Sequence, residues 1–343
     1  MRILLVSDAW LPQVNGVVRT LTHLRRELEA LGHTVHFITA EGRRSWPMPF
    51  YREIRLAFVR PSSMGREIDR FAPDAIHIAT EGPLGISARA WCVKKGLPFT
   101  TAFHTRYPEF ARSMFALPGL GPLLYALLRR FHRPAACTMV PTPSIREALT
   151  AAGFTNLKLW SRGVDHDLFQ PYGKEALDLP RPIFLCSGRV AAEKGLEAFL
   201  TLDLPGSKVI VGDGPERPRL QKAFPGVAFT GFLHNGAYAR TLAAADVFVF
   251  PSRYDTFGLV MLEAMACGVP VAAYPVPGPI DVVEDGATGA LHEDLRAAAL
   301  RALTVDGRSC RQYALTFTWR QVAEVFATLL VPSGLKSGAA SDR

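Results

Sequence analysis

The sequence contains little cysteine. Five cysteines are spread over 343 residues, at Cys92, Cys137, Cys186, Cys267 and Cys310. An odd number of widely separated cysteines argues against a disulfide framework and against a metal site. Most of the five lie within apolar runs, so we expect reduced thiols inside a hydrophobic core.

Long apolar runs are also missing. No stretch is long enough for a membrane-spanning helix, and the opening residues 1–7 have the pattern of a strand. A secretory leader would begin with positive, then apolar, then small residues. We therefore expect a protein of the cytoplasm.

Basic charge is concentrated in one half of the chain. The net charge is +8, and residues 1–165 hold 22 Lys and Arg against 12 Asp and Glu, a balance of +10, whereas the remaining residues hold 17 against 19, a balance of −2. A basic first half indicates an anionic partner such as nucleic acid, an anionic membrane or an anionic small molecule. Arginines solvated on helix faces are the alternative. No aromatic and basic motif of the RNA-binding modules is present, so we expect no nucleic acid.

Short apolar runs predict two series of strands, each separated by helical patterns. The first series comprises 2–7, 33–39, 74–79, 98–103 and 137–141; the second comprises 182–188, 207–214, 226–231, 246–252 and 269–274. Strands that alternate with helices predict a parallel sheet covered on both faces. We therefore expect an α/β protein of two Rossmann-like, doubly wound domains that face each other across a cleft.

The length and the turn-rich stretches set the domain limits. We predict a first domain at 1–165, a linker at 166–180, and a second domain at 181–312. A last helical segment at 313–332 is expected to cross back to the first domain, and 333–343 to form a disordered tail.

One helical segment raises a specific question. "DTFGLVMLEAMACGVP" (255–270) is apolar on nearly every side but contains Glu263, and no Lys or Arg occurs between Tyr254 and Leu295. A buried carboxylate needs a partner, which is either a distant basic residue or a ligand rich in hydroxyl donors.

A phosphorylated ligand would suit the start of this helix. Gly258 permits a tight turn from strand to helix, and the amides from Phe257 to Val260 then offer a seat for phosphate. Glu263 lies about 1.4 turns beyond Gly258, and Asp255 lies before the seat. A nucleoside diphosphate sugar placed there would offer hydroxyl donors to both carboxylates.

A second loop supplies positive charge. Arg189 and Lys194 stand five residues apart in "SGRVAAEKG", which follows a predicted strand. Ligands bind at the carboxyl ends of strands in open α/β sheets, so both cations are candidates for a diphosphate. An exposed pair at the entrance to a helix is the alternative.

In this combination the chain resembles the retaining glycosyltransferases of the GT-B fold, specifically family 4, also called group 1. The strongest resemblance runs from "PIFLCSGRVAAEKG" through "VIVGDGPE" and "FTGFLHN" to "VFPSRYDTFGLVMLEAMACGVPVAAYPVPGPIDVV".

The resemblance implies roles for the residues of both loops. Asp255 would hold hydroxyls of the donor sugar and Glu263 the ribose, while Arg189 and Lys194 neutralise the leaving diphosphate, which the backbone of Phe257, Gly258, Leu259 and Val260 binds. The family usually has Glu where this sequence has Asp255, which leaves open which sugar hydroxyl it reaches.

The resemblance also assigns roles elsewhere in the chain. The turn at Gly16 would close over the donor phosphates, His104 would hold the transferred sugar or the reacting oxygens, and the backbone around Phe232 would meet the base. The anomeric configuration would be retained, and no metal is expected because no Asp-x-Asp signature lies beside the loops. The donor base, guanine or uracil, stays open.

The acceptor is predicted from weaker patterns. Glu81 is either an acceptor contact or a helix N-cap, and Arg106 and Tyr107 are further acceptor candidates. The sequence looks most like GDP-mannose-dependent mannosyltransferases and bacterial diacylglycerol glycosyltransferases. The segment 113–133 joins apolar bulk to a cationic end, which is typical of a membrane-interface helix or of a core helix with a basic end.

We therefore expect a lipid acceptor and a peripheral position on the inner face of the cell membrane. Three alternatives remain: a glycosyltransferase with a soluble or polysaccharide acceptor, a nucleotide-sugar epimerase or hydrolase, and a non-catalytic nucleotide-sugar binder.

Overall fold

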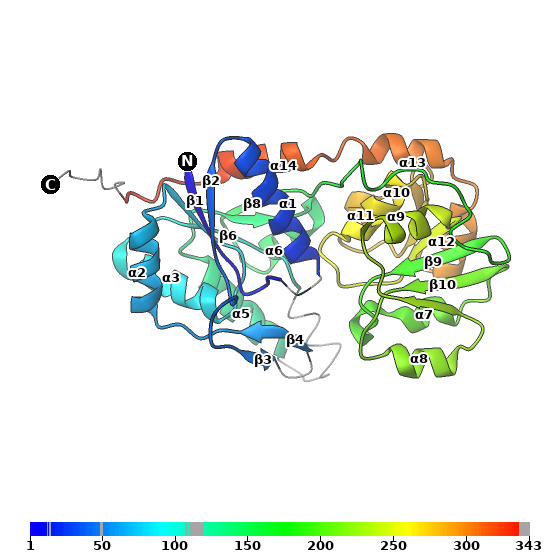
Figure 1. Cartoon of the computed structure of the whole chain (residues 1–343), viewed down its shortest axis with the longest axis horizontal. Coiled ribbons are helices and arrows are strands. Elements are labelled where there is room, and N and C mark those ends of the chain that lie inside the picture. The colour runs from blue at the N-terminus through cyan, green and yellow to red at the C-terminus, as the bar shows by residue number, and fades with distance from the viewer. Residues whose placement is uncertain (12, 14, 49–50, 107–108, 110–119, 336–343) are drawn as a thin grey trace. The chain divides into compact units, whose positions relative to one another are not determined.

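The computed structural model describes residues 1–11, 13, 15–48, 51–106, 109 and 120–335. This part of the chain divides into two compact units. Unit 1 takes the chain up to Ser161 and again from Trp319 onward, and unit 2 consists chiefly of Arg162–Thr318 (Figure 1). Each unit is built around its own parallel sheet.

The sheet of unit 1 has the strand order β2-β1-β5-β6-β7-β8. Its strands are β1 (Arg2–Val6), β2 (Thr34–Ile38), β5 (Ala75–Ile78), β6 (Thr100–Ala102), β7 (Thr138–Val140) and β8 (Leu157–Leu159). All neighbours pair in parallel, with Ile3 opposite both Val35 and Ala75. The carboxyl ends of these strands therefore share one edge.

The helices of unit 1 are α1 (Gly16–Ala30), α2 (Pro61–Phe71), α3 (Pro83–Lys95), α5 (Leu120–His132), α6 (Pro143–Ala151) and α14 (Trp319–Leu329). Helix α1 buries Leu21, Leu24 and Leu28, the stripe expected from the sequence pattern. Helix α14 packs beside α1 (Figure 1). In this contact Trp319 stacks on His23 with ring centroids 4.7 Å apart.

Unit 1 also contains an antiparallel hairpin that the sequence reading missed. Its strands are β3 (Trp46–Met48) and β4 (Tyr51–Leu56). Half of the residues of β4 are charged and β3 contains Pro47, so the usual signature of a strand is weak here.

Unit 2 repeats the architecture with the strand order β11-β10-β9-β12-β13-β14. Its strands are β9 (Ile183–Ser187), β10 (Ser207–Val211), β11 (Ala228–Gly231), β12 (Val247–Phe250), β13 (Val271–Ala273) and β14 (Gly289–Leu291). Its helices are η1 (Ala192–Lys194), α7 (Leu196–Leu200), α8 (Arg217–Ala223), α9 (Asn235–Ala244), α10 (Leu259–Ala266), α11 (Pro279–Val282), α12 (Leu295–Ala302) and α13 (Gly307–Ala314). The strands pair in parallel throughout the sheet.

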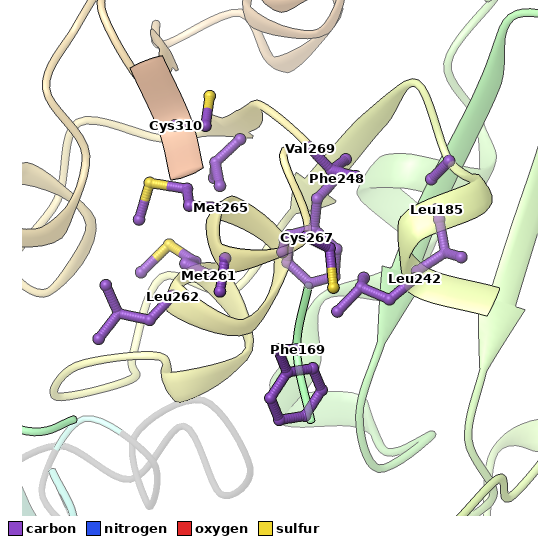
Figure 2. Close-up of a cluster of buried hydrophobic side chains, with 14 of the residues drawn as sticks. Phe169, Leu185, Leu242, Phe248, Met261, Leu262, Met265, Cys267, Val269 and Cys310 are labelled. Carbon is purple, nitrogen blue, oxygen red and sulfur yellow. The ribbon is translucent and has the colours of Figure 1, made fainter. Parts of the chain in front are cut away.

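Helix α10 lies within the core of unit 2, as its all-round apolar pattern predicts. Met261, Leu262 and Met265 are buried, and Figure 2 shows them with Phe248 and Cys267 in one cluster. The prediction of core thiols is confirmed, since all five cysteines are free and buried.

The segment predicted as a linker is part of unit 2, so the expected limits at 166–180 need correction. Phe169 is buried in the core of unit 2, and Tyr172 and Leu177 pack against that core. The turn-forming residues in this segment leave no helix or strand pattern in the sequence, and the segment was therefore predicted as a linker. Its apolar side chains nevertheless pack into the core. The chain instead passes between the units at Ser161–Arg162 and returns at Thr318–Trp319.

The start of the predicted tail is also packed. Ser333 is buried and its amide donates to the Asp74 carbonyl at 2.7 Å, beside a bridge between Ala75 and Pro332. Residues 336–343 lie outside the described residues.

Candidate functional site

The loop between β9 and α7 carries both predicted cations of unit 2. Gly195 adopts a left-handed φ of 63° and ends η1, so that Lys194 lies at the turn into α7. The Arg189 Nη2 donates to Glu193 Oε1 at 2.7 Å. Lys194 Nζ contacts Asp255 Oδ1 at 2.7 Å and Oδ2 at 3.0 Å.

The Lys194–Asp255 ion pair joins the two predicted loops. Here the structure differs from the expectation that sugar hydroxyls would serve Asp255 in place of a salt bridge. Burial raises the pKa of the Asp255 carboxyl, but the charge and hydrogen bond of Lys194, with help from Ser252 and Arg189, outweigh it and hold the pKa below 3.8. Asp255 is therefore ionised at neutral pH.

The pairing has a consequence for ligands. Arg189 and Lys194 each have a carboxylate partner on the same two loops. Two cations and two carboxylates leave the four side chains with no net charge. A diphosphate that binds Lys194 must therefore compete with Asp255 for the ammonium group.

The turn from β12 into α10 has the geometry that the sequence predicted. Gly258 has a φ of +84°, and a Cβ there would lie 2.7 Å from Met261 Cε and 3.0 Å from the Phe250 ring. The N-cap residue of α10 is Gly258, which has no side chain with which to cap the helix. Phe257 is buried in the core, while Leu259 and Val260 are partly buried. These residues can therefore offer a ligand only their backbone groups.

Glu263 is 6% exposed and accepts a hydrogen bond from the Tyr238 hydroxyl at 3.0 Å. The same hydroxyl lies 2.7 Å from Ser187 Oγ, at the end of β9. The sequence posed two alternatives for the partner of Glu263, a distant basic residue or a ligand with hydroxyl donors. Tyr238 is neither, because here a phenol of the protein itself provides the hydroxyl donor. Tyr238 stands 25 positions upstream, so local sequence offered no signal for it.

A glycine after β13 also belongs to this site and was missed. Gly278 has a φ of +100°, and a Cβ there would lie 2.8 Å from the Asp255 carbonyl oxygen. The loop that contains Gly278 therefore lies directly against the backbone of Asp255. Its signal in the sequence is the run "PVPGP", in which one glycine stands among three prolines.

The remaining donor candidate of unit 2 is Phe232. Its side chain is exposed, and its ring lies edge-on to His234 with centroids 4.6 Å apart. It follows β11 in the same strand-end position as the other loops.

In unit 1, Glu81 follows β5 and lies 3.2 Å from His132 Nε2, while His132 Nδ1 lies 2.9 Å from Thr101 Oγ1. The N-cap of α3 is Gly82, so the proposed N-cap role of Glu81 is wrong. The carboxylate that serves the first turn of α3 is Asp8, which accepts from the Leu84 amide at 2.9 Å.

His104 and Arg106 follow β6 and are half-buried. The His104 ring lies edge-on to Trp160 with centroids 6.1 Å apart. Gly16 is the first residue of α1, whose N-cap Asn15 accepts from the Val18 amide at 3.0 Å. Tyr107 lies outside the described residues.

Within the described ranges, no three His, Cys, Asp or Glu side chains gather as a metal site. The expected independence from metal stays a prediction. In the same part of the chain, every helix is too short or too polar to cross a membrane.

Comparison with known proteins gives two family matches. Residues 14–168 match the model described as Glycosyltransferase Family 4, and residues 181–305 match the model described as Glycosyl transferases group 1.

Three relatives cover most of the chain. Sulfoquinovosyl transferase SQD2 of Arabidopsis thaliana is 30% identical over 92% of this chain and 70% of its own length. The GDP-mannose-dependent alpha-mannosyltransferase of Mycobacterium tuberculosis (strain CDC 1551 / Oshkosh) is 33% identical over 85% and 83%. Alpha-monoglucosyldiacylglycerol synthase of Streptococcus pneumoniae is 28% identical over 88% and 78%.

Two solved structures share the fold. Sucrose-phosphate synthase of Thermosynechococcus elongatus aligns with a TM-score of 0.76 at 22% identity, covering 96% of this chain and 98% of that one. HepE of Anabaena, in complex with UDP and glucose, aligns with a TM-score of 0.71 at 16% identity and the same coverage. The predicted GT-B class is confirmed, and the chain belongs to the family 4, or group 1, glycosyltransferases.

Proposed function

We propose that this glycosyltransferase moves a hexosyl unit from a GDP- or UDP-linked sugar to a hydroxyl of a membrane lipid, with retention of the anomeric configuration. The observation that carries the donor half of the proposal is the Lys194–Asp255 contact, since Asp255 lies three residues before the glycine N-cap of α10. It places a cation, a carboxylate and a helix N-terminus within one part of unit 2.

In this proposal the diphosphate occupies the start of α10. The backbone from Phe257 to Val260 and the positive end of the helix dipole bind its oxygens. Lys194 leaves Asp255 for the phosphate, and Arg189 adds a second cation. Asp255, released from Lys194, then accepts from hydroxyls of the sugar, and Glu263 accepts from the ribose.

Chemically, the bond between the anomeric carbon and the β-phosphate oxygen breaks, and a bond from that carbon to the acceptor oxygen forms. The acceptor hydroxyl loses its proton, which leaves with the released nucleoside diphosphate. The cations and amides stabilise the negative charge that develops on the phosphate as the bond breaks. His104 contributes by holding the sugar or the reacting oxygens, and Gly16 by bringing its turn to the donor phosphates.

Phe232 is proposed to lie near the base, which its backbone contacts. Backbone groups distinguish guanine from uracil poorly, so the proposal includes both GDP-linked and UDP-linked sugars as donors. Thermal unfolding with GDP and with UDP separates them, since a ligand at a hundredfold excess over its Kd stabilises the fold by about 2.7 kcal/mol.

Two observations support a membrane lipid as the acceptor, namely the name of a relative and the exposed apolar face of helix α5. One relative is named as a diacylglycerol-linked synthase, and the basic first half of this chain suits an anionic membrane. Helix α5 buries Leu128 and Phe131 but exposes Leu123 and Leu127, four residues apart on one face, with Arg130 exposed nearby. Residues 113–119 of the predicted interfacial segment lie outside the described residues.

Vesicle flotation tests the membrane part. The protein should float with phosphatidylglycerol vesicles and not with phosphatidylcholine vesicles, and Leu123→Ser with Leu127→Ser should weaken flotation. Val325→Ser replaces another exposed apolar residue, on α14, and serves as the control. Equal flotation of all variants would remove α5 from the proposal without affecting the donor site.

A further inference from the structure

Unit 1 contains a cavity of about 350 Å³ at the carboxyl ends of β1 and β2. The position is the one in which open α/β sheets bind ligands. Ser45, which precedes β3, and Arg55 of β4 contribute to its lining. The lining residues are Asp8, Trp10, Leu11, Gln13, Ala40, Glu41, Ser45 and Arg55.

The inner walls of the cavity are held firmly. Trp10 is buried, with its ring centroid 4.2 Å from that of Phe37. The Asp8 carboxylate accepts hydrogen bonds from Thr80 Oγ1 and from the Leu84 and Gly85 amides. These bonds hold Asp8 in a fixed position in the cavity lining. These contacts preform the cavity before any ligand binds.

The polar groups of the outer wall have mixed character. Arg55 is held by Ser45, since its Nε lies 3.2 Å from Ser45 Oγ and its Nη2 lies 2.8 Å from the Ser45 carbonyl. The acidic residues Asp8 and Glu41 line the cavity together with the basic Arg55. A lining with more acidic than basic residues suits hydroxyl groups, which both donate and accept, better than it suits a phosphate.

Much of the cavity lining is apolar, and further exposed apolar side chains lie next to the lining residues. Leu11, a lining residue, is 57% exposed, and Trp46, next to the lining residue Ser45, is 47% exposed. Phe58 is 65% exposed and packs on Trp46 with ring centroids 6.0 Å apart. Three large exposed apolar side chains in one place indicate an apolar partner. Arg44 lies over the Trp46 ring at 5.4 Å.

We propose that this cavity binds the hydroxyl-bearing, uncharged headgroup of the lipid acceptor, of glycerol or hexose size, while the acyl portion lies over Leu11, Trp46 and Phe58. This inference rests on the proposed function and specifies its acceptor. It selects neutral glycerolipids and their glycosides over acceptors with an anionic headgroup.

The test compares four acceptors in detergent micelles with whichever nucleotide sugar is active. They are dihexanoylglycerol, dioleoylglycerol, the monoglucosyl form of dioleoylglycerol, and phosphatidylinositol. Transfer should occur to at least one of the first three and not to phosphatidylinositol. Donor hydrolysis without acceptor is measured in parallel, because it reports on the donor site alone.

Two sets of variants then separate the headgroup from the acyl contact. Glu41→Gln should raise the acceptor KM about tenfold, the equivalent of about 1.4 kcal/mol, with every active acceptor and leave donor hydrolysis unchanged. Trp46→Ser with Phe58→Ser should raise the KM for the dioleoyl acceptors more than that for dihexanoylglycerol, whose acyl chains are shorter. Val325→Ser is the matched control.

An unchanged acceptor KM in both sets would overturn the inference, and so would transfer to phosphatidylinositol alone. Donor hydrolysis without transfer to any of the four acceptors would also overturn it. A different result would contradict the proposed function itself: the unmodified protein would neither hydrolyse nor transfer any nucleotide sugar.

Discussion

Glu263 lies inside a helix that is apolar almost all round, and a tyrosine hydroxyl from α9 is its partner in the protein. The sequence predicted a buried carboxylate that needs a donor, and this part of the prediction follows from burial alone. Which residue supplies the donor depends on how α9 packs against α10, and no pattern within either helix encodes that. The ribose contact of Glu263 stays a prediction.

Tyr238→Phe tests the role of this hydrogen bond. The change removes the hydroxyl that orients Glu263 while keeping the ring in the core, where it packs against Phe169. Because Glu263 would no longer be held in place, affinity for the nucleoside diphosphate should fall about tenfold, the equivalent of about 1.4 kcal/mol. Titration calorimetry with GDP and UDP measures it, and unchanged affinity would show that Tyr238 does not position Glu263.

Gly278 provides a residue-scale test of the Asp255 loop. Gly278→Ala places a Cβ 2.8 Å from the Asp255 carbonyl, whereas Gly286→Ala has a similar φ of +81° but meets nothing within 4 Å. Both variants should lose about 1–2 kcal/mol of stability from backbone strain. Only Gly278→Ala should also lower kcat/KM for the donor, by about 10- to 100-fold, because it displaces Asp255.

Steady-state kinetics measures kcat/KM for both alanine variants, and thermal unfolding measures their loss of stability as the control. If the two alanine variants had equal kcat/KM, Gly278 would have a purely structural role.

At the scale of elements, the strands of both sheets were predicted within a few residues, because buried parallel strands read as short apolar runs. The exceptions are the hairpin β3–β4, in which β3 contains Pro47 and half of β4 is charged, and the short strands β8, which is largely exposed, and β14, which begins with a glycine. Arg55 of β4 lines the cavity of unit 1, so this lining residue was missed together with its strand.

Helix α3 depends on a residue 76 positions away. Asp8 links the end of β1 to the first turn of α3 by accepting from the Leu84 amide. Asp8→Ala leaves buried donors unsatisfied and should destabilise the protein by about 1–3 kcal/mol. Asp306→Ala removes an exposed N-cap from α13 and is the matched control, with a smaller expected loss.

The pH dependence of the Asp8 variant has a defined sign. Burial raises the pKa of the Asp8 carboxyl above 3.8 in the folded protein, against the opposing hydrogen bonds from Leu84 and Thr80. The stability contributed by Asp8 is therefore greatest below 3.8 and falls as pH rises through the folded-state pKa. Denaturant unfolding should show a larger penalty for Asp8→Ala at acid pH than at neutral pH, and the opposite trend would contradict the raised pKa.

At the scale of the whole molecule, the two halves carry different charge, and we propose that they have different tasks. The basic half contains the proposed acceptor cavity and α5, and the slightly acidic half contains the candidate donor site. The repetition of strand and helix patterns was enough to predict two Rossmann-like units. The crossing points were predicted less well, because residues 166–180 carry turn formers and yet pack as core.

The cysteines of both units should be inert in the native protein. Burial raises the pKa of Cys92, Cys186, Cys267 and Cys310 to about 12, and it also raises that of Cys137. Thiolate is the reactive form, so a colorimetric disulfide reagent at pH 8 should label almost no thiol until the protein is unfolded, when all five react. Rapid labelling of the folded protein would contradict this burial.

The central claim is that the candidate site in unit 2 delivers a hexosyl unit from a nucleotide sugar with retention. The most direct measurement is proton NMR of the reaction of GDP- and UDP-linked hexoses with a diacylglycerol acceptor, following the anomeric signal of the product. The account predicts release of one nucleoside diphosphate and a glycoside with the donor's anomeric configuration, both abolished by Lys194→Ala. An inverted product, or full activity in Lys194→Ala, would contradict it.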